Sequence, residues 1–175
     1  MNLPIDNPMA LSEFRSTDKA RLVEHLNERD IYDRTLRIPH PYAEADADNW
    51  LGIVARSTKR EGQPIQWAIR DSEGELIGGY GFDGLRIGKT HRAEIAYWLA
   101  KPYWGRGIMT ATVQRVCEHG VTEFGLVKII AHVFDFNIAS ARVLEKCGFE
   151  LEGRLRKHFK KDGRYIDARL YGLVT

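Results

Sequence analysis

The spacing of apolar residues predicts alternating strands and helices along the chain. Residues 93–99 combine β-branched, aromatic and other apolar side chains, which is typical of a buried strand, and Pro102 ends the run because proline offers no ladder donor. Further on, apolar residues recur at the spacing of one helical face, at Met109, Val113, Val116, Cys117, Gly120, Val121 and Phe124. The pattern therefore predicts a strand that ends near residue 100 and a helix that begins just after Gly107.

A second buried strand is expected directly after this helix. The segment K-I-I-A-H-V-F, residues 128–134, is rich in β-branched side chains. A strand–helix–strand unit with a right-handed crossover places its two strands parallel. Another helix is expected over 138–146, ended by Gly148, where a glycine suits the left-handed conformation of a helix C-terminus.

Shorter patterns predict the elements on either side of this unit. Two prolines in residues 35–42 indicate an irregular loop. The remaining expected elements are a strand in 9–15, helices over 16–26, 28–33 and 43–60, a hairpin in 65–82, and a terminal hairpin of 149–160 and 165–174 around K-D-G-R. The predicted fold class is therefore mixed α/β, with a largely antiparallel sheet and a central parallel strand pair.

Composition adds the expectation of a single domain that covers residues 1–175. Hydrophobic residues make up 43% of the chain and charged residues 29%, which is ordinary for a globular protein. No apolar run approaches the roughly 20 residues that span a bilayer, and residues 1–8 lack the basic and apolar regions of a signal peptide. We therefore expect a cytoplasmic protein without a membrane partner.

Charge and metal-ligand spacing narrow the classes of partner. A net charge of +2 argues against direct nucleic-acid binding. Six cationic side chains nevertheless gather in residues 154–164, and either a phosphate or acidic partner or a solvated hairpin flank would explain them. The six histidines lack ligand spacing and the two cysteines lack C-x-x-C spacing, so no metal site and no disulfide framework are expected.

The strand-to-helix turn W-G-R-G, residues 104–107, is the first candidate site. Glycines let an anion approach the backbone closely, and the amides at a helix N-terminus face that anion with the positive end of the dipole. The turn is therefore a candidate pyrophosphate cradle, while ordinary turn chemistry is the other interpretation. The phosphate-binding motif G-x-x-x-x-G-K-[ST] is absent from the chain.

Several segments stand in a characteristic order: E-I-A-Y-W-L, W-G-R-G-I-M-T, the next strand, N-I-A-S-A-R-V-L-E-K-C-G-F-E-L-E-G and the terminal hairpin. Together they resemble the GNAT superfamily of N-acetyltransferases, and most of all its Rim-type branch of ribosomal-protein N-terminal acetyltransferases (RimJ/RimL). In the superfamily's signature Q/R-x-x-G-x-G/A, Gly107 matches the central position, whereas Trp104 and Met109 depart from the first and last. The resemblance implies the GNAT-like acyl-CoA N-acyltransferase fold, whose parallel strand pair splays to admit acetyl-CoA.

The resemblance also implies which residues bind acetyl-CoA. Those expected at the pyrophosphate are Gly105, Arg106, Gly107, Ile108, Met109 and Thr110. Those expected to pair with the pantetheine arm, in the manner of an added strand, are Trp98, Leu99 and Ala100. Asn137 matches the family's asparagine that holds the cofactor, and the same residue suits the N-cap of the next helix; these roles are compatible.

Acetyl transfer further needs a proton for the departing thiolate and a base for the amine. Many members of the superfamily supply the proton from a tyrosine, but that position is Leu144 here, and the Rim-type branch suggests a serine that matches Ser140. A serine near a helix start also acts as a cap, so both roles stay open. Glu94 is the candidate base, because the predicted strand places it on one face with Ala96 and Trp98.

Other interpretations of these catalytic positions stay open. The Glu94 carboxylate would also suit a substrate's positive charge or a local arginine. His91 and Tyr103 are weaker alternatives as base, and the donor to the oxyanion would be a strand amide near Leu99.

The expected function is transfer of the acetyl group of acetyl-CoA to a primary amine, first of all the N-terminal α-amine of a protein such as a ribosomal protein. An α-amine with a pKa near 8 is about a tenth neutral at pH 7, whereas a lysine near 10.4 is neutral about once in two thousand. The α-amine therefore needs less help from a base. Two alternatives are an acetyltransferase for a polyamine, antibiotic or amino-acid derivative, and a non-catalytic acyl-CoA-binding module. A homodimer is left open.

Overall fold

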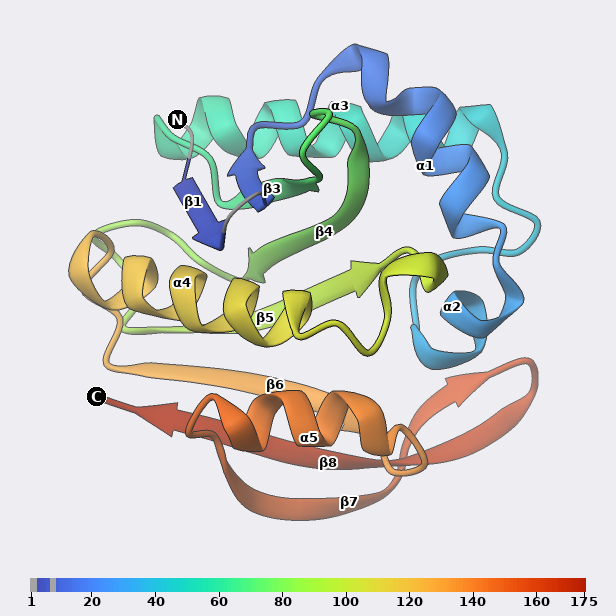
Figure 1. Cartoon of the computed structure of the whole chain (residues 1–175). Helices are drawn as coiled ribbons and strands as arrows, with labels where there is room; N and C mark the ends of the chain where they lie inside the picture. Colours follow the sequence, from blue (N-terminus) through green and yellow to red (C-terminus); the bar gives the residue numbers. More distant parts are fainter. Residues whose placement is uncertain (1–2, 7–8) are drawn as a thin grey trace. The chain divides into compact units, whose positions relative to one another are not determined.

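The computed structural model describes residues 3–6 and 9–175, and the chain divides into two compact units. Unit 1 takes its residues from Met1–Gly81 and Tyr97–Thr112, and unit 2 from Phe82–Ala96 and Val113–Thr175. Figure 1 labels the helices and strands along the chain. Within the described ranges, no helix is both long and apolar enough to cross a membrane.

Unit 1 contains strands that pair antiparallel in chain order and helices that cover an apolar core. The strands are β1 (Leu3–Asp6), β2 (Met9–Ser12), β3 (Gln66–Arg70) and β4 (Leu76–Asp83), whose last two residues belong to unit 2. The helices are α1 (Lys19–Leu26), α2 (Arg29–Arg34) and α3 (Glu44–Glu61). The core cluster consists of Leu22, Leu26, Ile31, Tyr42, Ala47, Ala68 and Leu76.

Two elements pass from one unit to the other along the chain. They are β5 (Arg92–Leu99), whose last three residues belong to unit 1, and α4 (Ile108–Thr122), whose first five do. The segment between them contains a short 3-10 turn, Lys101–Tyr103, and lies wholly in unit 1.

Unit 2 contains the parallel strand pair and the terminal hairpin. Its further elements are β6 (Lys128–Phe134), α5 (Ile138–Lys146), β7 (Glu150–Lys161) and β8 (Arg164–Val174). The strands are ordered β5-β6-β8-β7, and Figure 1 shows β6, β8 and β7 running side by side. The parallel register runs from Arg92↔Lys128 to Glu94↔Ile130, and both strands continue beyond it.

A bulge interrupts the long hairpin of unit 2. Pairing passes from Leu155↔Ala168 to Phe159↔Ile166, so residues 156–158 of β7 lie opposite Asp167 alone. Lys157 within this bulge has a φ of 51°, and its amide donates to the Asp167 carboxylate at 2.7 Å. The hydrogen bond therefore holds the left-handed residue, and the bulge redirects the side chains that follow it.

The predicted mixed α/β fold with one parallel strand pair is confirmed, and β6 and α5 have the predicted bounds. Two differences are local. The first expected strand ends at Ser12 rather than at residue 15, and the expected helix over 16–26 begins as a 3-10 turn. We did not predict β1, because four residues that include Pro4 carry little strand signal, although an edge strand tolerates proline.

Candidate active site

The turn 104–107 forms an open backbone cradle in unit 1, at the start of α4. Gly105 and Gly107 have φ values of 74° and 77°, in the left-handed region that disfavours any side chain. A Cβ atom built on either glycine would meet no atom within 4 Å, so the backbone can be approached closely. Such an approach is what a pyrophosphate requires.

The same turn exposes amide donors at the helix N-terminus. The first hydrogen bond of α4 runs from the Ala111 amide to the Gly107 carbonyl at 3.1 Å. The amides of Ile108 and Met109 precede that bond and have no acceptor within the helix. Open glycines followed by such amides fit the pyrophosphate of a coenzyme A thioester.

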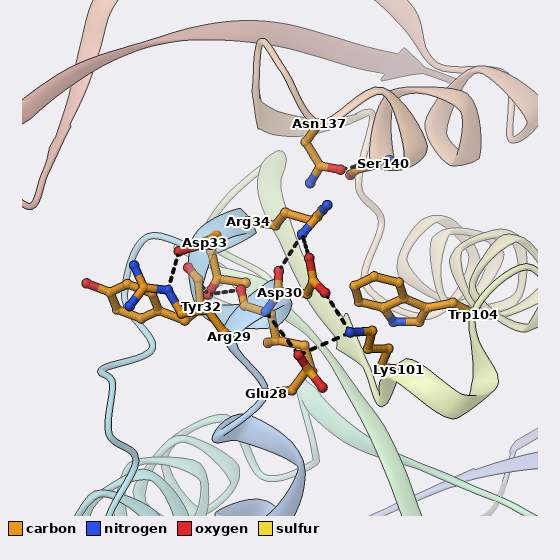
Figure 2. Close-up of polar contacts among 12 residues, drawn as sticks. Glu28, Arg29, Asp30, Tyr32, Asp33, Arg34, Lys101, Trp104, Asn137 and Ser140 are labelled. Atoms are coloured by element: carbon orange, nitrogen blue, oxygen red, sulfur yellow. Dashed lines mark hydrogen bonds and ion pairs between the residues drawn. The ribbon is translucent and has the colours of Figure 1, made fainter.

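Trp104 links this turn to the end of β5 and to α2. Its indole nitrogen donates to the Leu99 carbonyl at 2.7 Å, and the Arg34 guanidinium lies 5.5 Å from its ring centroid. Figure 2 shows Asp30 between Arg34 and Lys101, with ion-pair distances of 2.5 and 2.7 Å. The hydrogen bond from Lys101, and then that from Arg34, holds the pKa of Asp30 below its usual range. Helix α2 therefore contacts the segment between β5 and α4 at two points, Lys101 and Trp104.

The end of β5 supports only part of the expected pantetheine site. The Ala100 amide donates to the Ile77 carbonyl at 2.8 Å, and the Ala100 carbonyl accepts from the Tyr103 amide at 3.0 Å. Both backbone groups of Ala100 are therefore engaged. Because successive residues of a strand present their amides to opposite edges, the Leu99 amide faces away from β4. The Trp98 side chain packs against the core of unit 1.

Glu94 lies in unit 2 beside His132, a residue that we did not select from the sequence. His132 Nδ1 lies 2.9 Å from Glu94 Oε1, and the side chains are 17% and 33% exposed, respectively. The ring of His132 stacks on His158, with centroids 5.0 Å apart and planes 12° apart. Within the described part of the chain, no group of three or more His, Cys, Asp or Glu side chains is arranged to hold a metal ion.

Asn137 and Ser140 lie at the start of α5 in unit 2. Asn137 is the N-cap, and its side-chain oxygen accepts from the Ser140 amide at 3.3 Å, as Figure 2 shows. The structure thus shows the capping role of Asn137, and its role toward acetyl-CoA stays a prediction. The N-cap of α5 is thus Asn137 and not Ser140, the residue for which we had also considered a capping role. Leu144, at the position of the family's tyrosine, is fully buried.

The two weaker candidates for the base lie in different surroundings. The Tyr103 hydroxyl donates to the Asp71 carboxylate at 3.0 Å, and burial followed by this hydrogen bond raises the pKa of Tyr103. Only the phenolate form could take a proton from an amine, and a raised pKa makes that form scarcer at neutral pH. His91 is an exposed residue just before β5.

Part of the basic cluster in residues 154–164 is engaged within unit 2. One guanidinium nitrogen of Arg154 lies 2.8 and 2.9 Å from the two carboxylate oxygens of Asp135. The ammonium groups of Lys157 and Lys160 lie 6.0 and 5.8 Å from the ring centroid of Tyr165. These contacts favour the interpretation of the cluster as a hairpin flank.

Comparison with known proteins identifies a family over most of the chain. The family model described as "Acetyltransferase (GNAT) domain" matches residues 9–150. The uncharacterized N-acetyltransferase YoaA of Bacillus subtilis (strain 168) is 38% identical over 117 residues, 66% of this chain and 65% of that protein. The spermidine N(1)-acetyltransferase of Vibrio cholerae is 31% identical over 112 residues, 63% of this chain and 64% of that protein. The chain thus spans less than two thirds of the length of these relatives.

The relatives are named for acceptors of several kinds. Their names include ribosomal protein uS5, spermidine and L-amino acids as the acetylated molecules. Among solved structures, RimL, a ribosomal L7/L12 alpha-N-protein acetyltransferase in complex with coenzyme A, has a TM-score of 0.89. This likeness covers 99% of this chain and 98% of that one at 19% sequence identity, and it shows the fold.

Proposed function

Because the chain belongs to the GNAT acetyltransferase family, we propose that it transfers the acetyl group of acetyl-CoA to a primary amine, first of all the N-terminal α-amine of a protein. The observation that carries the proposal is the open glycine cradle before α4, within the stretch that matches the family. The match over residues 9–150 includes residues of both units, which supports the prediction of a single domain.

The cradle and two flanking segments are proposed to bind acetyl-CoA. Residues 105–110 supply the backbone groups for the pyrophosphate, since two glycines leave the approach open and the helix amides face the anion. The Leu99 amide is proposed to pair with the pantetheine arm or with the oxyanion, because it faces the free edge of its strand in unit 1. Ala100 is not supported as a partner, because its backbone groups are engaged. Asn137 keeps its proposed contact with the cofactor.

The proposed reaction is direct attack of a neutral amine on the thioester carbonyl. Glu94 draws a proton from the acceptor's ammonium group, directly or through water. The amine nitrogen then bonds to the carbonyl carbon, and a backbone amide donates to the oxyanion that forms. As the oxyanion re-forms the carbonyl, the carbon–sulfur bond breaks and Ser140 gives its proton to the thiolate. The nitrogen's second proton passes through water to restore the serine hydroxyl, which leaves the neutral amide and the free thiol of coenzyme A.

The choice of acceptor rests on the chemistry of amines. A protein N-terminus is about two hundred times more often neutral at pH 7 than a lysine side chain. A site whose proposed acid is a serine suits such a weakly basic acceptor. The Rim-type motifs of the sequence point to the same substrate class. A polyamine is the second candidate, because a relative that is 31% identical is named for spermidine.

A thiol-release assay with acetyl-CoA and a panel of amines tests the proposal. The panel comprises peptides with a free N-terminal Ala, Ser or Met, spermidine, and lysine peptides blocked at the N-terminus. We expect turnover on the free N-termini. Turnover on spermidine alone would move the proposal to the polyamine. Binding of acetyl-CoA in calorimetry without turnover on any amine would favour a non-catalytic acyl-CoA-binding module.

A further inference from the structure

His132 lies on the same face as Glu94 because of the strand register. Glu94 pairs with Ile130 in the parallel ladder, and His132 is two residues further along β6. Side chains two residues apart in a strand share a face, so the imidazole comes to lie beside the carboxylate. Their polar atoms are 2.9 Å apart, which is a hydrogen bond with the ring nitrogen Nδ1.

The bulge in β7 fixes the orientation of this imidazole from a second strand. His158, the last residue of the bulge, stacks on His132, and the ring of the next residue, Phe159, meets His132 edge-on at 6.0 Å and 81°. His132 is therefore held by a carboxylate at one nitrogen and by two rings. Bulges often lie next to active sites, where they redirect side chains.

We propose that His132 is the group through which Glu94 acts: the imidazole takes the proton of the acceptor amine at Nε2, and Glu94 positions the ring through Nδ1. This inference rests on the proposed function and adds a residue to it. With Nδ1–H donated to the carboxylate, Nε2 carries the free lone pair. The ammonium proton moves to Nε2, the amine keeps its electron pair for attack, and the imidazolium is stabilised by the adjacent carboxylate.

The choice of imidazole over carboxylate follows from proton affinity. An ordinary glutamate has a pKa near 4.3 and an ordinary histidine one near 6.5, whereas an α-amine has one near 8. A base is most effective when its pKa lies near the working pH, so the imidazole accepts the amine proton with the smaller mismatch.

The other charged groups around His132 come from three strands. On β5, Arg92 shares the face of Glu94 two residues away. On β7, a protonated His158 would disfavour a second positive charge on His132, because the two rings are stacked. On β8, the residue opposite His132 is the uncharged Leu170, and its neighbour Arg169 lies on the other face with its guanidinium on Asp135. Glu94 is therefore the nearest charge and favours the imidazolium.

The kinetic test is the pH profile of kcat for His132→Gln with the best amine of the panel. We expect kcat to fall about a hundredfold, the range typical of a lost general base, with the KM of acetyl-CoA within twofold of the wild type. The acidic limb that the imidazole causes should disappear. His40→Gln, an exposed histidine in a loop of unit 1, serves as the matched control and should keep both kcat and the limb. A kcat within threefold of the wild type and an unchanged limb in His132→Gln would overturn the proposal.

A second test does not depend on turnover. Histidine side-chain nitrogen NMR of the whole chain should show the neutral ring of His132 with Nδ1 protonated and Nε2 bare, and Glu94→Ala should let the other tautomer appear because Nδ1–H loses its acceptor. The same single tautomer in both proteins would sink the positioning role of Glu94. A wild-type protein that acetylates no amine would overturn the proposed function and with it the catalytic role of His132, whereas the tautomer would still decide whether Glu94 orients the ring.

Discussion

Gly105 and Gly107 shape the cradle through backbone conformation alone, since neither has an atom within 4 Å of a Cβ position. A left-handed residue other than glycine costs about 1–2 kcal/mol. In the cradle, a methyl group would also occupy the approach to the helix amides. A glycine elsewhere with the same conformation carries only the first of these two effects.

Gly107→Ala should therefore weaken acetyl-CoA binding by about tenfold or more, beyond a stability loss of about 1–2 kcal/mol. Gly163→Ala is the matched control, because Gly163 has a φ of 74° in the tip of the β7–β8 hairpin and also has an open Cβ position. Calorimetric titration and urea unfolding measure the two effects. Equal affinities in both variants would contradict the assignment of the cradle to the pyrophosphate.

Ser140→Ala should lower kcat by about a hundredfold at unchanged acetyl-CoA affinity, because the thiolate would leave without a proton donor. The cap of α5 should stay in place, since it uses the Ser140 amide and not its hydroxyl. Single-turnover kinetics measures the effect on kcat, and thermal unfolding measures the effect on the helix cap. A kcat within twofold of the wild type would remove this serine from the mechanism.

At the scale of elements, helix α5 begins with a residue that has two proposed tasks. Asn137→Ala should lose about 1 kcal/mol of stability through the missing cap and should also weaken acetyl-CoA binding. Asn137→Asp keeps the cap, since aspartate is an equally good N-cap, but its carboxylate would repel the phosphates. Weak binding together with unchanged stability in Asn137→Asp would separate the two tasks, and unchanged binding would leave Asn137 with the cap alone.

The end of β6 is tied to the terminal hairpin by Asp135, which accepts hydrogen bonds from Arg169 and Arg154. The hydrogen bond from Arg169, and then that from Arg154, lowers the pKa of Asp135. A carboxyl group with a lowered folded-state pKa adds stability that is fully present above its unfolded pKa of about 3.9, and that is lost as the pH falls through the folded-state pKa.

Asp135→Asn should therefore be less stable than the wild type from pH 5 to 8, and the two should converge as the pH falls below about 3.9. Urea unfolding at a series of pH values measures this difference. A gap of constant size from pH 7 down to pH 3 would show that the charge of Asp135 is not its cause.

At the scale of the whole molecule, the net charge of +2 is small and part of the most basic segment is engaged. Arg154 pairs with Asp135, and Lys157 and Lys160 lie near Tyr165. A chain with so small a net charge releases few counterions from a nucleic acid, and nonspecific affinity falls steeply with salt. We expect no binding of a 20-base-pair DNA duplex at about 150 mM salt in fluorescence anisotropy. Micromolar binding under those conditions would give the basic flank a partner.

The sequence by itself determined most of the elements, the glycine turn and the family resemblance. Apolar periodicity and local turn residues encode helices and strands within short windows, so β6, α5 and the Asp-Gly turn of the last hairpin could be located. The glycine turn before α4 could also be located, because glycines mark turns within a short window.

Only the tertiary structure decided which side chains meet. The pair of Glu94 and His132, which are 38 positions apart in the chain, depends on the register between β5 and β6, because a shift of one residue would turn either side chain to the other face. The stacking of His158 depends on a bulge that no local pattern signals. The engagement of both backbone groups of Ala100 depends on hydrogen bonds to β4 and from the following turn. These features come from nonlocal pairing, which the periodicity of single segments does not encode.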